Sequence, residues 1–417
     1  MILTKKKTIL LFVNFGVSLF FLFILSVKGG HNIAPTFFII IGLIYFITFF
    51  LRKKIWVISA SDKALMLSYI VYFSLFLLSF IVHDGRLKEL DNPVRVLLFL
   101  PLLLLFSHYP VNFKTIILSI PAGAAIAGLV AFYDSFILKS AAAYSPRLLQ
   151  IQGGDIAMSL SMFSLVTSLY FWAHKKYFVM LLSLFAMLAA ILGSFLSTAR
   201  GGWIGLPIVI PLILYCFRQS LSTKFIVSFI ATVLIAIVSV AMLPQLKVMQ
   251  RVYEAEEEIT AYFVENNSST SVGARFDMWK SALLMAKEKP ILGWGSEGTN
   301  TERKKQVEVG VISSFAGQFE HAHNQYLDDL SKRGSLGLLS LLCIFLVPLY
   351  HFMQHLKTAF LEQKTIALLG IVHIISTMFY CISQSFFTHN SGNVFYFFLI
   401  LIFYGALKAF EIKQIEK

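Results

Sequence analysis

Charge is scarce in this chain. Only 14% of its 417 residues are Asp, Glu, Lys or Arg, whereas about a quarter of the residues of an ordinary soluble domain are charged. Hydrophobic residues make up 57%, and the mean hydropathy is +0.76. These values exclude an ordinary soluble protein, because water could not be the main solvent of such a chain.

Cysteine and acidic residues are also scarce. The three cysteines, Cys216, Cys343 and Cys381, lie within or at the ends of apolar runs, so we expect no disulfide. The formal net charge is +13, which in a soluble protein would suggest a nucleic-acid partner. Here the basic residues lie mostly at the ends of apolar runs, where they set membrane orientation. We therefore expect no nucleic-acid partner.

Long apolar runs dominate the chain and predict an all-α polytopic membrane protein. A bilayer core about 30 Å thick takes about 20 helical residues to cross. The runs are apolar on every face rather than at alternate residues, which favours helices over membrane-spanning strands. We predict about twelve transmembrane helices, at residues 8–27, 36–51, 64–82, 94–107, 115–133, 154–173, 177–197, 202–217, 225–243, 335–354, 365–384 and 394–409.

The distribution of basic residues predicts the orientation of these helices. Lysines and arginines are concentrated in the segments that cytoplasmic termini would place inside, so the positive-inside rule selects that orientation. Residues 1–243 and 334–417 would form the membrane part, and residues 244–333 an external, largely helical cap. Within the cap we expect one helix at 250–265 and a second that begins near Arg275 and ends before Pro290.

Two arginines lie beside glycines at the external face. Arg200 precedes Gly201 and Gly202 at the end of a span, and Arg275 follows Gly273 at the entry to the second loop helix. A guanidinium can bind phosphate through paired hydrogen bonds, and helix starts favour anions, so a lipid-diphosphate clamp is one interpretation. The simpler alternatives are an interfacial arginine that reaches lipid headgroups for Arg200 and an ordinary solvated or salt-bridged loop residue for Arg275.

The segment His321-Ala322-His323-Asn324 is the third candidate. A histidine can lose its proton near neutral pH, which suits a general base that acts on a sugar hydroxyl. The pair could instead be structural, or could bind a metal, although the loop offers no matching ligand cluster. Arg95 and the segment 152–155 are weaker candidates near the same face. A transporter would suit the same number of spans, but charges deep in several helices or broken helices in two related halves are not evident.

Taken together, these segments make the sequence similar to the O-antigen ligase and polymerase superfamily. Members of this superfamily are integral membrane glycosyltransferases of the bacterial inner membrane. The similarity spans nearly the whole chain. Its most specific positions are the segment 198–202, Gly273, Arg275, Trp279, Ala282, Pro290, Gly293, Gly295, the segment 321–327 and Gly334.

This resemblance implies a GT-C-like architecture, an active site on the periplasmic side and an undecaprenyl-diphosphate-linked glycan as donor. The ligase branch passes the glycan to lipid A-core in lipopolysaccharide biosynthesis, and the polymerase branch passes it to another lipid-linked repeat; the sequence is most similar to the ligase branch. Arg200, Arg275 and His323 would be catalytic, and Arg95, His321 and Asn324 would bind substrate. No cofactor and no metal are expected, and membrane lipids would be the remaining partners.

Overall fold

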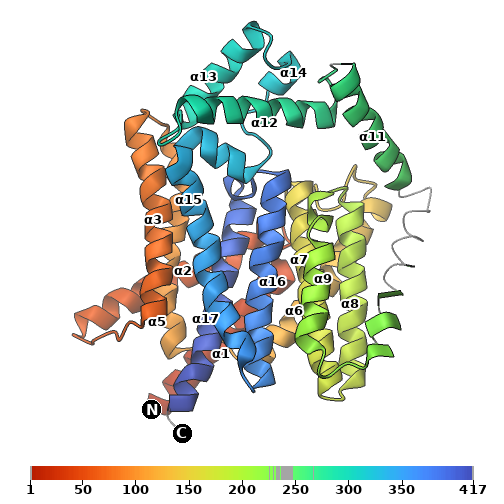
Figure 1. Cartoon of the computed structure of the whole chain (residues 1–417). Coiled ribbons are helices and arrows are strands. Elements are labelled where there is room, and N and C mark those ends of the chain that lie inside the picture. The colour runs from red at the N-terminus through yellow and green to blue at the C-terminus, as the bar shows by residue number, and fades with distance from the viewer. Residues whose placement is uncertain are drawn as a thin grey trace.

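The computed structural model describes residues 2–224, 226–228, 230–231, 235, 248–265 and 267–415. These residues form helices and connecting turns, and they include no strand. Most of the long helices run side by side in one bundle, and a second set of helices lies across one end of it (Figure 1). Both termini lie at the opposite end of the bundle. The predicted all-α polytopic class is confirmed.

Ten helical segments of the described chain are long and apolar enough to cross a membrane. The helices that form them are α1 (Ile2–Phe23), α2 (Gly30–Leu51), α3 (Ala60–Val82), α4 (Asp91–Phe99) with α5 (Pro101–His108), α6 (Phe113–Phe132), α7 (Gln150–Ala173), α8 (Tyr177–Leu196), α15 (Gln325–Gln354), α16 (Leu361–Ser383) and α17 (Asn390–Ile415). The shorter η3 (Gly201–Trp203) and α9 (Leu206–Phe217) match the span predicted at 202–217. Most of the span predicted at 225–243 lies outside the described residues.

The helices divide into a buried centre and a rim. α7, α16 and α17 are buried along most of their length, whereas α2 and α3 expose much of theirs. The exposed side chains of the rim include large apolar ones such as Phe37, Ile44 and Leu67. An apolar outer surface is what contact with lipid requires, because hydrocarbon offers no partner to polar groups.

One predicted span is a broken helix. The segment 94–107 was expected as a single helix, but α4 ends at Phe99 and α5 begins at Pro101. Proline lacks the backbone N–H that would continue the hydrogen bonds of the helix, and its ring clashes with the preceding turn. The helical segment also starts earlier than predicted, with a 3-10 turn at Leu87–Leu90.

Four helices of the described residues lie at the capped end of the bundle: α11 (Val248–Val264), α12 (Ser271–Glu288), α13 (Gly295–Glu308) and the short α14 (Ser314–Gly317). α11 confirms the helix predicted at 250–265. The second helix begins at Ser271, and the prediction of a start near Arg275 is wrong by about one turn. The reason is Thr270, whose hydroxyl accepts a hydrogen bond from Gly273 N at 3.0 Å and caps the helix earlier.

Two glycines join this cap to the bundle. α15 has a break at Gly334, where φ is 64° and ψ is −162°. A Cβ there would lie 2.2 Å from the carbonyl oxygen of Ile291. Only glycine therefore allows the backbone at 334 and the backbone at 291 to approach so closely. Ser335 N donates to Pro290 O at 2.7 Å, and Trp294 N donates to Ser331 O at 3.0 Å. Gly293, at φ 68°, faces the same break and has the same restriction.

Candidate active site

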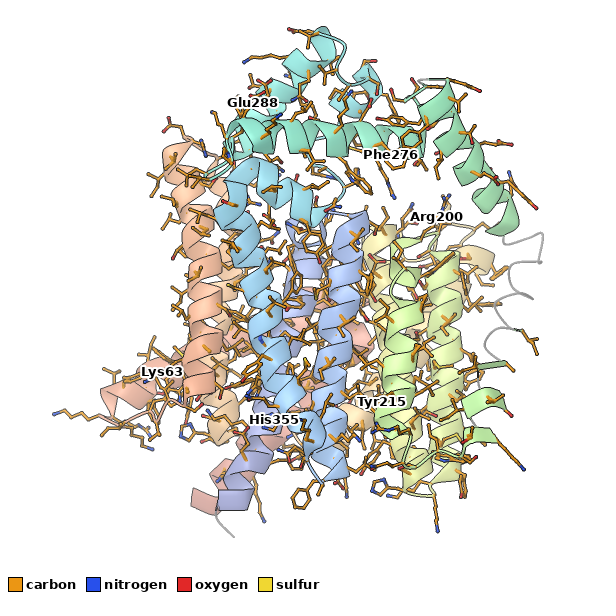
Figure 2. The ribbon with its side chains drawn as sticks, viewed as in Figure 1. Lys63, Arg200, Tyr215, Phe276, Glu288 and His355 are labelled. Carbon is orange, nitrogen blue, oxygen red and sulfur yellow. The ribbon has the colours of Figure 1, made fainter. Side chains whose placement is uncertain are left out.

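Arg200 lies at the end of the bundle that faces the cap. Figure 2 shows it below α12, on which Phe276 is labelled. It belongs to the turn between α8 and η3, where Thr198 has a positive φ of 62°. The turn places Arg200 in an exposed position, so its guanidinium is available to a ligand.

The glycines after Arg200 serve helix packing. A Cβ at Gly201 would lie 2.0 Å from Ser383 Oγ, and one at Gly202 would lie 3.2 Å from Asp155 Oδ1. The space beside both glycines is therefore filled by α16 and α7 and is not left for a ligand. The close packing holds the Arg200 turn against the two buried helices.

Arg275 approaches the same region from the cap. It lies in the second turn of α12 and is half-buried. Burial lowers its pKa, and the positive charge of Arg200 lowers that pKa further, whereas Glu258 opposes the shift. The two guanidinium groups are thus close enough to repel each other, although 75 residues of sequence separate them. Such a pair forms a strong local positive potential that an anion would neutralise.

The histidine segment forms a tight turn beneath α12. Trp279 Nε1 donates to Ala322 O at 3.1 Å, and Ala322 N donates to Asp328 Oδ1 at 3.1 Å. His323 occupies a left-handed conformation, with φ at 47°. A non-glycine residue in this region is uncommon and is often found where a side chain must be directed to a site. The turn therefore has fixed contacts on both sides.

Both histidines of the turn have a lowered pKa. Burial lowers the pKa of His323 to about 3, and the charges of His321 and Arg275 add to the shift, while Asp328 opposes it. Burial also lowers the pKa of His321, where Asp328 again opposes the shift. Both imidazoles are consequently neutral near pH 7 and hold a free electron pair, which a general base requires.

The carboxamide oxygen of Asn324 caps α15. It accepts hydrogen bonds from Tyr326 N at 3.0 Å and Leu327 N at 3.2 Å, and the residue itself is buried. Substrate binding by Asn324 stays a prediction, and its amide nitrogen is the atom that could perform it. The cap explains why an asparagine stands directly before this helix.

Arg95 belongs to a neighbouring polar cluster. Its guanidinium donates to Asn390 Oδ1, and Asn390 Nδ2 donates to Asn32 Oδ1 at 3.0 Å. Asn390 directly follows His389, whose ring centroid lies 6.4 Å from that of His321. The structure therefore brings Arg200, Arg275, His321 and His323 together. Arg95 lies beside this group and is connected to it through Asn390 and His389. Its role in substrate binding stays a prediction.

Two further residues of this region were not found from the sequence. Burial and the charge of His321 lower the pKa of His389, which ends the turn between α16 and α17. Arg303 of α13 is buried, and its Nη1 donates to Phe319 O at 2.5 Å. His389 follows a polar turn at the correct end of a span, which is a signal that could have identified it. Arg303 stands among charged neighbours and gave no such signal.

The weak candidate segment at 152–155 is part of a buried network. Gln384 Nε2 donates to Asp155 Oδ2, and Gln152 Nε2 donates to Gln384 Oε1 at 3.1 Å. The network joins α7 to the turn that carries His389. We therefore interpret these residues as support for the site rather than as ligands.

The arrangement has the parts needed for transfer from a diphosphate. Two guanidinium groups can neutralise a diphosphate leaving group, and neutral imidazoles beside them can accept a proton. The parts come from the bundle, from α12 and from the turn before α15, so the site exists only when the cap is folded onto the bundle.

Comparison with known proteins identifies the family of this chain. Residues 185–342 match the family model described as O-antigen ligase, a range that includes Arg200, Arg275, His321 and His323. The chain is also 44% identical over 399 residues to an uncharacterised protein of Haemophilus influenzae strain Rd, in an alignment that covers 96% of this chain and 99% of that protein. This chain belongs to the O-antigen ligase family of membrane proteins.

Proposed function

We propose that this protein is an O-antigen ligase that transfers a glycan from undecaprenyl diphosphate to a sugar hydroxyl of lipid A-core, on the periplasmic face of the bacterial inner membrane. The observation that carries the proposal is the convergence of Arg200 and Arg275 with His323. Each of these residues has a simpler interpretation alone, but three separate segments would not be expected to bring them together by packing alone.

The residues have complementary roles in the proposed reaction. The acceptor oxygen attacks C1 of the donor sugar, and the bond from C1 to the phosphate oxygen breaks with its electron pair leaving on the diphosphate. Arg200 and Arg275 stabilise the negative charge of this leaving group. The hydroxyl proton passes to the imidazole of His323. A single displacement inverts the anomeric centre.

The repulsion between the two arginines supports a diphosphate ligand. Without an anion, burial and the positive charge of Arg200 both disfavour the charged guanidinium of Arg275. A diphosphate would remove this unfavourable interaction and bind through paired hydrogen bonds. Arginines in this role need no divalent ion, so we propose a metal-independent transfer.

A polymerase of lipid-linked repeats would use the same donor and the same residues, and it is the alternative within this family. Deletion of the gene and analysis of the surface lipopolysaccharide separate the two. A ligase predicts loss of all glycan from lipid A-core while long lipid-linked chains remain. A core that carries one repeat instead indicates a polymerase. Lipopolysaccharide identical to that of the parent would contradict both and revive a transporter.

A further inference from the structure

We infer that His351, His355 and Glu411 form a zinc site at the end of the bundle opposite the cap. Their three ligand atoms lie within 4.8 Å of one another. His351 lies in the last turn of α15, His355 directly follows that helix, and Glu411 comes from α17. Figure 2 shows His355 at the end of the molecule away from Arg200, so this cluster is separate from the candidate active site.

The hydrogen bonds of His355 favour a ligand role. His355 Nδ1 lies 2.9 Å from the carbonyl oxygen of His351, and a carbonyl can only accept, so Nδ1 carries the proton. Its Nε2 lies 2.7 Å from Glu411 Oε1. Two electron pairs can face each other at this distance only if a proton or a cation lies between them. Metal-binding histidines commonly donate their other N–H to a carbonyl in this way.

His351 supplies the second observation. Its side chain is 7% exposed, and its buried Nε2 has no hydrogen-bond partner among the residues that the structure describes. A buried polar atom without a partner destabilises the fold, so a ligand that binds it would be favoured. The ring packs against His355 with centroids 4.8 Å apart, and one of its two nitrogens is among the three ligand atoms of the cluster. A simple His355–Glu411 ion pair would leave His351 unexplained.

The ligand types and the surroundings favour zinc. Two imidazoles and one carboxylate are a common zinc set that leaves a fourth position for water, whereas calcium and magnesium prefer oxygen alone. Tetrahedral zinc with bonds of about 2.0 Å separates its ligands by about 3.3 Å, so the three groups need to move only slightly. A cavity of about 480 Å³ lies beside His351, and its polar lining residues include Ser61, Gln354 and Tyr404. Among the described side chains, Asp62 and Lys408 also lie close enough to act on His351, and they bind each other.

A zinc ion at this site would cross-link the end of α15 to α17. Zinc that binds only the folded chain would stabilise it by RT ln(1 + [Zn²⁺]/Kd), so the stabilisation should grow as the zinc concentration rises above Kd. The expected result is one zinc ion per purified full-length chain and a rise in the melting temperature that EDTA reverses. His351→Gln, His355→Gln and Glu411→Gln should each weaken zinc binding by about tenfold or more and remove the rise.

Matched controls exclude binding by other histidines. His174 makes the same contact to a carbonyl four residues earlier, at 3.0 Å, but lies outside the cluster. His174→Gln and His321→Ala should bind zinc as the natural chain does. Equal zinc binding by Glu411→Gln and the natural chain, or a loss in His321→Ala alone, would overturn the site. If a variant cannot be purified, the visible spectrum of the natural chain with Co²⁺ decides: strong tetrahedral bands support the site, and only weak octahedral bands refute it.

Discussion

The imidazole rings of His321 and His323 meet edge to face, with centroids 4.1 Å apart and an interplanar angle of 72°. His323 also meets the ring of Phe319, with centroids at 5.3 Å. Two histidines this close cannot both hold a proton without strong repulsion, and the charge of His321 adds to the lowering of the pKa of His323. The pair thus prepares one imidazole as a base.

His323→Ala should reduce transfer by about 10²- to 10⁴-fold, because a general base contributes about that much. Binding of the lipid-linked donor should change little, since both arginines remain. The measurement pairs the transfer rate with donor binding in the same protein, and His321→Ala serves as the milder comparison. Substantial transfer by the alanine variant would eliminate His323 as the base, and loss of donor binding in a folded protein would make it a diphosphate ligand.

The pH dependence should differ between the free enzyme and the donor complex. The pKa of His323 is lowered to about 3 in the free enzyme, so kcat/KM should stay high well below pH 6.5 and fall only on further acidification. Donor diphosphate offsets the charge of Arg275 and raises this pKa, so the fall in kcat should begin at a higher pH. Profiles of the two parameters, measured separately, check this order.

Folding must be followed across the same pH range. The histidine of the unfolded chain keeps an ordinary pKa of about 6.5, and the folded value is lower, so the unfolded state binds more protons between the two. Stability contributed by neutral His323 is therefore present above pH 6.5 and lost as the pH falls. A fall in kcat/KM near pH 6.5 without unfolding would contradict the lowered pKa.

Arg200→Lys and Arg275→Lys should each reduce transfer by about 10²-fold or more, as loss of one stabilising donor does elsewhere. The ammonium keeps the charge but loses the planar fork that binds two phosphate oxygens. Lys280→Arg, an exposed position of α12 whose Nζ donates to Val311 O at 2.9 Å, is the control that should stay active. Near-normal transfer by either lysine variant, correctly inserted, would remove that arginine from the clamp.

Transfer should continue in EDTA at a temperature where the chain stays folded. The proposed chemistry uses arginines, and the inferred zinc site is at the other end of the bundle. The assay should include Glu411→Gln, which separates the two ends of the molecule. Transfer that EDTA abolishes and one divalent metal restores, even in this variant, would make the arginine-only account wrong.

The cap and the turn at Lys175 should lie on opposite sides of the membrane. Cysteines placed at Asn267 and Lys175, both exposed, can be labelled from outside the cell in a background where the exposed Cys343 is serine. We expect labelling at 267 and none at 175, because the basic residues divide in that way. Labelling of 175 alone would reverse the orientation and place the candidate site in the cytoplasm.

The sequence by itself determined the membrane class, most of the spanning helices and the first loop helix. These follow from local causes: apolar runs of sufficient length, and a backbone that must satisfy its own hydrogen bonds in lipid. It missed the break at Leu100–Pro101 and the start of α12 at Ser271, because those ends depend on one proline and one capping threonine. For the span predicted at 225–243, mostly outside the described residues, the sequence remains the only guide.

Tertiary structure alone decided which candidates meet. Arg200, Arg275 and His323 lie on separate segments, and no local pattern states that α12 crosses over the turn that carries Arg200. Arg303 is buried, whereas the neighbouring Lys304 and Lys305 are exposed. The pattern of charges in the sequence could not reveal this difference. The pKa of His323 is likewise a property of burial and of charges from other helices. Local sequence specifies helices through short-range energetics, whereas the electrostatics of a site depend on distances that only the packed chain fixes.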